Sequence, residues 1–239
     1  MPDAELPDAF YRRRVSEEIA AGEPELALLA SLIRPGGTAV DIGANQGIFA
    51  YVLSGIAGCV HAFEAHPDTA DFARRHLGKR ATVHTIALSN AKGCGSFFVP
   101  FAEDGTELHY AGNLKNTHSQ FASQKVIETE VETLDSFGLT DVTFIKADVE
   151  GSELEVLEGA RVTIARDRPV LLLELLSGTY ADPLAITRQV CDLYGYDAFV
   201  VHDGRPQEAS PIIAALRSNT TWGSPFATRN VLFQPRMAV

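Results

Sequence analysis

The sequence contains few cysteines, an excess of acidic over basic residues and no long apolar run. Its three cysteines, Cys59, Cys94 and Cys191, form no C-x-x-C pair, which argues against a disulfide framework or a zinc knuckle and fits a reducing cytoplasm. Twenty Lys and Arg against 31 Asp and Glu give a formal net charge of -11. Because that charge repels phosphate backbones, we expect no nucleic-acid partner.

Long hydrophobic segments are also missing. The apolar run at residues 170–176 is interrupted by Glu174, and residues 1–22 are charged throughout. A membrane span needs about 20 predominantly apolar residues, and a signal peptide needs an uncharged apolar centre. We therefore expect a cytoplasmic protein that neither crosses a membrane nor binds one.

Short apolar runs alternate with helical patterns along the chain. This alternation over 239 residues, 46% of them hydrophobic, is typical of βαβ units in one α/β domain with a doubly wound, mostly parallel sheet. The predicted strands are residues 38–42, 58–64, 82–87, 142–147, 170–175, 198–202 and 230–234. The predicted helices are residues 8–20 and 24–33 within an N-terminal region 1–36, then 67–77 and 184–194.

The connection between residues 87 and 142 is unlike the others. Residues 93–100 and 125–132 read as extended segments, so we predict a β-hairpin inserted over residues 93–132. Between its strands lies a polar, turn-rich stretch, residues 101–124, which includes His118. Long loops in compact domains are often functional, and we expect this one to form the acceptor side of a site.

The sharpest local feature is the segment TAVDIGANQG at residues 38–47, a strand that leads through a glycine turn into a helix near Ile48. A dinucleotide site would need G-x-G-x-x-G, but this register places Asn45 and Ile48 at the second and third glycines. S-adenosylmethionine suits the loop better. Backbone N–H groups at the helix start can bind its carboxylate, and Asp41 can hold its ammonium group.

A second acid follows the next strand. Glu64 lies about 20 residues beyond the glycine turn, where such folds hold the two ribose hydroxyls. The alternative for either acid is that it only caps the following helix.

Together these blocks resemble the FkbM family of S-adenosylmethionine-dependent methyltransferases over residues 38–176. The blocks are VDIGANQG (40–47), AFEAHP (62–67), ALSN (87–90) followed by Gly93, ETLD (132–135), IKADVEG (145–151) with Glu153 and GA (159–160), and RPVLLLE (168–174). The resemblance implies a Rossmann-like class I fold of seven strands with an antiparallel last strand. From the sequence pattern, residues 177–239 supply a helix and the last two of these strands. The cofactor-binding residues so expected are Asp41, Gly43, Ala44, Asn45, Gly47, Glu64, Ala65, Leu88, Ser89 and Asp148.

The chemistry centres on the strand and turn at residues 144–155. Lys146, Asp148 and Glu150 lie at or just past the carboxyl edge of the strand, and Glu174 points to the same rim. Ser152 and Glu155 match a capping box for the next helix. Lys146 can instead act only as an ion-pair partner of Asp148, and the acids can face a helix dipole.

Many members of the resembled family methylate hydroxyl oxygens, which implies the same activity here, with a sugar or secondary metabolite as acceptor. An alcohol needs a base to accept its proton, and the candidates are Asp148 first, then Glu150, Glu174 and His118. No metal ligands are predicted, although several acids at one rim would allow a divalent cation. The alternatives are a carboxylate methyltransferase, a non-catalytic nucleoside-binding module and, least favoured, an NAD-dependent oxidoreductase.

Overall fold

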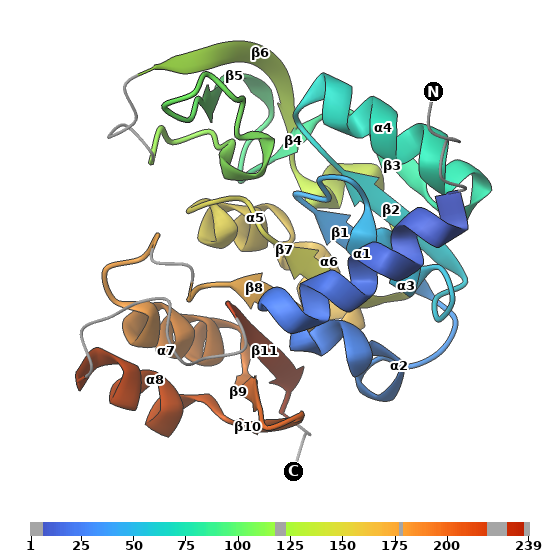
Figure 1. Cartoon of the computed structure of the whole chain (residues 1–239). Coiled ribbons are helices and arrows are strands. Elements are labelled where there is room, and N and C mark those ends of the chain that lie inside the picture. Colours follow the sequence, from blue (N-terminus) through green and yellow to red (C-terminus); the bar gives the residue numbers. More distant parts are fainter. Residues whose placement is uncertain (1–6, 118–122, 177–178, 219–228, 237–239) are drawn as a thin grey trace.

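The computed structural model describes residues 7–117, 123–176, 179–218 and 229–236, without the side chains of 215–218. Its centre is an eight-stranded sheet in the order β10-β9-β11-β8-β7-β1-β2-β3 (Figure 1). The strands are β1 (Thr38–Ile42), β2 (Cys59–Phe63), β3 (Thr82–His84), β7 (Val142–Ala147), β8 (Val170–Glu174), β9 (Tyr196–His202), β10 (Arg205–Glu208) and β11 (Asn230–Pro235). Strand β11 runs antiparallel to both β8 and β9, and β10 pairs antiparallel with β9. The predicted mostly parallel sheet with an antiparallel last strand is confirmed.

Helices cover both faces of this sheet, which makes the fold doubly wound. One face packs against α5 (Glu153–Gly159), α6 (Arg161–Asp167), α7 (Pro183–Tyr194) and α8 (Ala209–Ser218). The opposite face packs against α1 (Pro7–Ala21), η1 (Pro24–Ala27), α2 (Leu29–Leu32), α3 (Ile48–Leu53) and α4 (Pro67–Leu77). None of the described helices is both long and apolar enough to cross a membrane.

The predicted insertion forms a second, three-stranded sheet above the main one (Figure 1). Strands β5 (Gly93–Pro100) and β6 (Gln124–Glu132) pair antiparallel along their length, as the extended segments predicted. Strand β4 (Ala87–Leu88) pairs parallel with β6, and the short helix η3 (His109–Ala111) lies in the connecting loop. Two further short helical turns, η2 (Gly78–Arg80) and η4 (Leu134–Phe137), link the larger elements.

Three elements differ from the sequence prediction. The strand expected at 82–87 is divided, because β3 ends at His84 and β4 leaves the main sheet to join the insertion. The helix expected at 24–33 is a 3-10 turn followed by a four-residue helix. Strand β10 was not predicted, and it raises the strand number from seven to eight. Its exposed Arg-Pro-Gln-Glu sequence carries no alternation of apolar residues.

The first helix supports the glycine turn. Tyr11 of α1 is fully buried, stacks on Tyr51 of α3 at 4.6 Å between ring centroids, and donates a hydrogen bond of 2.8 Å to the Gln46 carbonyl oxygen. The N-terminal helices therefore hold the loop between β1 and α3 in place.

Candidate functional site

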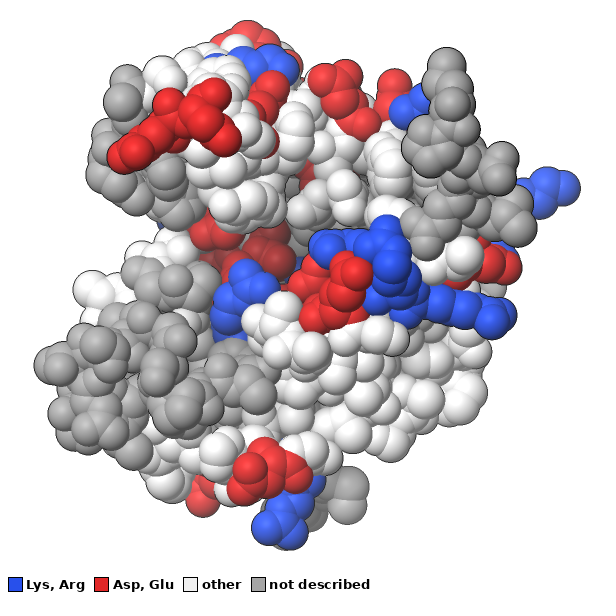
Figure 2. All heavy atoms as spheres, in the orientation of Figure 1, with Lys and Arg blue, Asp and Glu red and all other residues white. Residues whose placement is uncertain are grey.

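A cavity of about 560 Å³ opens at the carboxyl ends of β1, β2, β7 and β8. The insertion forms its other wall, and Figure 2 shows acidic side chains inside the hollow between the two parts. The structure brings ten of the predicted residues to its lining, namely Asp41, Gly43, Ala44, Asn45, Glu64, Ala65, Leu88, Asp148, Glu150 and Glu174. Gly47 and Ser89 are described but lie outside the lining, and His118 falls outside the described residues.

The turn after β1 requires glycine at position 43. Gly43 has a φ of 72°, and a Cβ there would lie 1.7 Å from the Asp148 carbonyl oxygen. The Asp148 N–H also bonds the Ile42 carbonyl oxygen at 3.0 Å, so the turns after β1 and β7 are in direct contact. Glycine lets the two backbones meet at the floor of the cavity.

Asp41 lies on this floor and is buried. Its Oδ2 accepts a 2.9 Å hydrogen bond from the Ala50 N–H, so the carboxylate does contact the following helix, as the capping alternative held. Its Oδ1 is buried without a hydrogen-bond partner among the described residues. Burial raises the pKa of Asp41 to about 6, opposed by the nearby Lys146 charge. A buried acceptor of this kind fits a ligand that brings a donor, such as an ammonium group.

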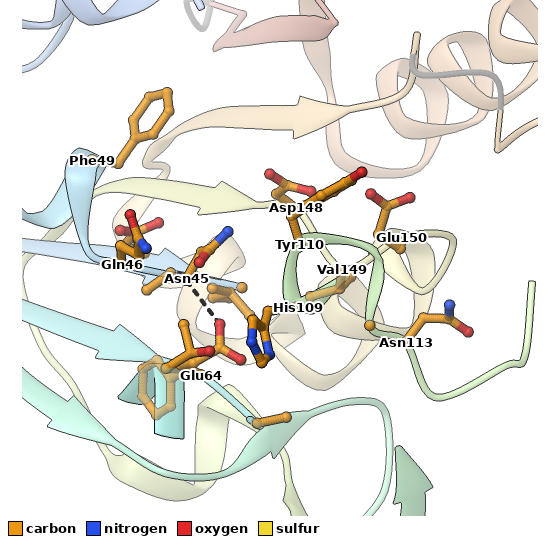
Figure 3. Close-up of a pocket in the computed structure, with 18 of the residues that line it drawn as sticks. Asn45, Gln46, Phe49, Glu64, His109, Tyr110, Asn113, Asp148, Val149 and Glu150 are labelled. Atoms are coloured by element: carbon orange, nitrogen blue, oxygen red, sulfur yellow. Dashed lines mark hydrogen bonds between the residues drawn. The ribbon is translucent and has the colours of Figure 1, made fainter. Parts of the chain in front are cut away.

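Glu64 is held rigidly at the end of β2 (Figure 3). One carboxylate oxygen accepts the Asn45 N–H and the other accepts the His66 N–H, each at 2.8 Å. Burial raises the pKa of Glu64 to about 7, although these two hydrogen bonds lower it. Each oxygen keeps a further acceptor position, so the carboxylate can receive two hydroxyl groups of one ligand.

Asp148 after β7 and Glu174 at the end of β8 have pKa values shifted in opposite directions. Burial alone would raise the pKa of Asp148, but the Lys146 ammonium at 2.9 Å lowers it below its usual value. Burial and the adjacent Asp148 charge raise the pKa of Glu174 well above its usual value. In the hydrogen-bonded pair of Glu174 and Asp148, these opposite shifts favour the proton on Glu174 over Asp148. Arg229 lies 3.8 Å from Glu174 and adds a second positive charge at this rim.

Glu150 has the pKa best suited to proton transfer at neutral pH. Burial, followed by repulsion from Asp148, raises its pKa to about 7. The Thr179 hydroxyl donates to its carboxylate at 3.2 Å, and its backbone has a left-handed φ of 52°. Strained backbone at a cavity wall is characteristic of functional sites.

The loop that carries Glu150 is held by the neighbouring acid Glu153. This fully buried carboxylate accepts hydrogen bonds from the Val149 N–H at 2.9 Å and the Gly151 N–H at 3.1 Å, and from the Tyr180 hydroxyl.

The predicted capping box is wrong, because the Ser152 side chain makes no cap hydrogen bond and Glu155 pairs with Lys115 at 2.6 Å.

Several lining residues were not singled out from the sequence, although three of them lie in the stretch 101–124 that was expected on the acceptor side. The insertion contributes His109, Tyr110 and Asn113, and Phe49 comes from α3 (Figure 3). Glu23 comes from the N-terminal region. Their positions depend on how the insertion and the N-terminal helices fold back over the sheet. No local motif marks them, although the length of the loop indicated that some of its residues would reach the site.

This sheet order, the glycine turn after β1 and the acids at the ends of β1, β2 and β7 define the class I methyltransferase architecture. Residues 41–197 match the family model described as the methyltransferase FkbM domain. The chain belongs to the FkbM methyltransferases, a family that uses S-adenosylmethionine. A search of curated proteins found no match.

Comparison with solved structures supports the fold through one match with a TM-score above 0.5. Methyltransferase FkbM from Methylobacillus flagellatus KT superposes with a TM-score of 0.56 at 18% identity, covering 95% of this chain and 50% of that one. The present chain therefore spans half the length of that protein. A methyltransferase from Geobacter sulfurreducens gives a TM-score of 0.48 at 11% identity, covering 99% of this chain and 93% of the other. A putative methyltransferase from Streptococcus mutans in complex with SAH gives 0.45 at 12% identity, covering 89% and 96%.

Proposed function

We propose that the chain transfers a methyl group from S-adenosylmethionine to a hydroxyl oxygen of a small acceptor, a sugar or a secondary metabolite. The observation that carries this proposal is Glu150, a carboxyl group with a pKa of about 7 in the cavity wall. A base of that pKa is ionised in half of the molecules at neutral pH and accepts a proton readily.

The residues on the sheet side of the cavity fit the cofactor. The unpartnered Asp41 Oδ1 would accept from its ammonium group, and the Glu64 carboxylate would hold the ribose hydroxyls. Ala65 and Leu88 supply an apolar wall, which suits the adenine ring. When bound, S-adenosylmethionine supplies a methyl group activated by the adjacent sulfonium.

The acceptor would enter between the insertion and the acids after β7. Glu150 would take the hydroxyl proton as the new carbon–oxygen bond forms. Asp148 is a weaker base because its ion pair with Lys146 stabilises the ionised form, so it would orient the acceptor. Lys146 and Arg229 already compensate the negative charge of Asp148 and its neighbours, so the arrangement does not require a divalent cation.

Methylation of a carboxylate is the nearest alternative, and it needs no general base because the nucleophile is already charged. A non-catalytic nucleoside-binding module is the other, and it gives no reason for an acid of raised pKa on the acceptor side. The first alternative predicts that Glu150 can be replaced without loss of turnover, and the second predicts no turnover in the parent protein.

The test is the variant Glu150→Gln, assayed by release of S-adenosylhomocysteine with a panel of hydroxylated and carboxylated acceptors. We expect kcat to fall by about 10²- to 10⁴-fold while the Kd for S-adenosylmethionine changes less than about two-fold. In the parent protein kcat/KM should fall as the pH drops through about 7, because Glu150 then becomes protonated, and the variant should lose that dependence. Glu158→Gln, an exposed acid on α5, is the control. Equal activity of parent and variant, or methylation of carboxylates only, would contradict the proposal.

A further inference from the structure

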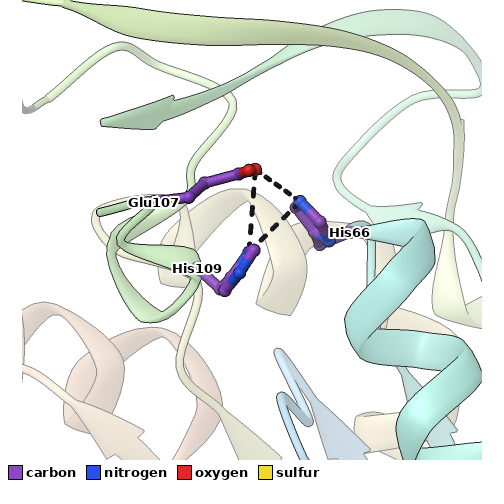
Figure 4. Close-up of side chains that lie close together, drawn as sticks. All are labelled: His66, Glu107 and His109. Atoms are coloured by element: carbon purple, nitrogen blue, oxygen red, sulfur yellow. Dashed lines mark hydrogen bonds and ion pairs between the residues drawn. The ribbon is translucent and has the colours of Figure 1, made fainter. Parts of the chain in front are cut away.

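Two histidines and a glutamate converge at the wall of the cavity, in a cluster that includes none of the acids after β7 and at the end of β8 (Figure 4). His66 lies at the start of α4, whereas Glu107 and His109 belong to the inserted loop. The His66 Nε2 atom lies 2.9 Å from Glu107 Oε1 and 3.3 Å from His109 Nδ1, and the last two atoms are 3.7 Å apart. Sequence spacing gave no hint of this cluster, because His66 and His109 are 43 positions apart.

We propose that His66, Glu107 and His109 form a binding site for a divalent transition metal of the zinc type. Imidazole nitrogens and a carboxylate oxygen are the ligands of open, water-accessible zinc sites. With metal–ligand bonds of about 2.0–2.1 Å and tetrahedral angles, neighbouring ligand atoms are separated by about 3.3 Å. The three separations in this cluster, 2.9, 3.3 and 3.7 Å, are centred on that value.

Hydrogen bonding alone accounts poorly for the same geometry. His66 Nε2 faces both Glu107 and His109, but a neutral imidazole nitrogen carries one proton or one lone pair and cannot serve both partners well. An ion at the centre would satisfy all three groups at once. His66 Nδ1 would then carry the proton and donate to the Thr69 hydroxyl, 3.3 Å away, in place of the 3.4 Å hydrogen bond that it accepts from the Thr69 N–H.

The residues around the cluster would need little rearrangement to bind an ion. The His66 side chain is completely buried, so its ring is already fixed. Lys125 lies 3.0 Å from Glu107 Oε1 and 3.4 Å from Oε2, and it competes with the ion for Oε1 but can stay on Oε2. Glu107 and His109 line the cavity, so water can supply a fourth ligand. A bound ion would join the insertion to the start of α4, next to Glu64.

The test uses Co²⁺ alone, added to chelator-treated full-length protein, with absorption spectra recorded during the titration and during displacement by Zn²⁺. We expect one Co²⁺ per chain with the intense bands of tetrahedral coordination and displacement by one equivalent of Zn²⁺. His109→Asn and Glu107→Gln should each weaken binding at least about ten-fold, since even changes around metal ligands have effects of that size. His202→Asn, on β9, is the control, and His66 is left intact because it also caps α4.

Absence of Co²⁺ binding, or equal binding by the parent protein and both variants, would overturn the proposal. So would loss of binding in Glu150→Gln, which would place the ion on the acids after β7. Thiolate charge-transfer bands would place it on an exposed cysteine, Cys59 or Cys94. None of these measurements uses the cofactor or an acceptor, so the outcome is independent of the proposed transferase activity.

Discussion

Gly43 illustrates how one residue determines the cavity floor. Replacing it with alanine places a Cβ 1.7 Å from the Asp148 carbonyl oxygen on a backbone with positive φ. Because backbone must move, we expect Gly43→Ala to lower stability by more than about 2 kcal/mol and to abolish S-adenosylmethionine binding. Gly36→Ala is the matched control, since Gly36 also has positive φ but nothing lies within 4 Å of its added Cβ. Thermal unfolding and cofactor titration give the comparison, and similar losses in both variants would contradict the account.

The sequence alone placed the acids at one edge of the sheet, but it did not indicate which of them is the better base. Asp41, Glu64 and Asp148 could be placed at the cavity because acids at the carboxyl ends of parallel strands share one edge of the sheet. Their pKa values could not be predicted, since these depend on burial and on partners from other elements. Asp148 was the first candidate for the base. Its ion pair with Lys146 makes Glu150 the better one.

Among the elements, the insertion contacts the loop after β7. Lys115 donates to the Gly151 carbonyl oxygen at 2.8 Å and pairs with Glu155 at 2.6 Å, and the Thr117 hydroxyl donates to the Glu150 carbonyl oxygen at 3.2 Å. These contacts join the acceptor side of the cavity to the proposed base.

We therefore expect Lys115→Ala to raise the KM for the acceptor several-fold while leaving the Kd for S-adenosylmethionine unchanged. The polar contacts of Lys115 that the structure describes are with Gly151 and Glu155, on the Glu150 side of the site. Lys92→Ala is the control. Lys92 pairs with Glu132 at the end of β6, in the three-stranded sheet of the insertion, and contacts no cavity residue that the structure describes. Steady-state kinetics on both variants would decide, and equal effects would argue against a positioning role for the insertion.

The elements that sequence patterns predicted are those with strong apolar periodicity. Strands β1 and β7 and helix α4 have the predicted bounds, because buried strands and amphipathic helices carry that signal along the chain. The division of residues 82–87 between two sheets follows from pairing with β6, which is distant in sequence. C-terminal residues 177–239 hold α8 and β10 in addition to the predicted helix and two strands.

Across the whole molecule, several buried acids link stability to pH. Burial raises the pKa of Glu23 and Glu64 to about 7 and that of Asp41 to about 6. At pH values between the ordinary pKa of these acids and their raised pKa, the folded chain binds more protons than the unfolded chain. The contribution of the three acids to stability therefore falls as the pH rises. For Glu64 the shift corresponds to roughly 3 kcal/mol.

Glu64→Gln should therefore make the dependence of Tm on pH flatter between pH about 5 and about 7.5, because one of these linked protons is removed. The variant should also be less stable than the parent protein at the acidic end, since an amide can accept only one of the two N–H groups. Parallel curves of Tm against pH for parent and variant would show that Glu64 does not titrate as described.

The central claim, that the cavity at the end of the sheet binds S-adenosylmethionine, is tested most directly by calorimetric titration. The parent protein is titrated in parallel with S-adenosylmethionine, S-adenosylhomocysteine and NAD. The account predicts micromolar binding of both sulfur nucleosides, weakened at least about ten-fold in Glu64→Gln through loss of the paired acceptor, and no response to NAD. Binding of NAD alone, or no binding of either sulfur nucleoside, would contradict it.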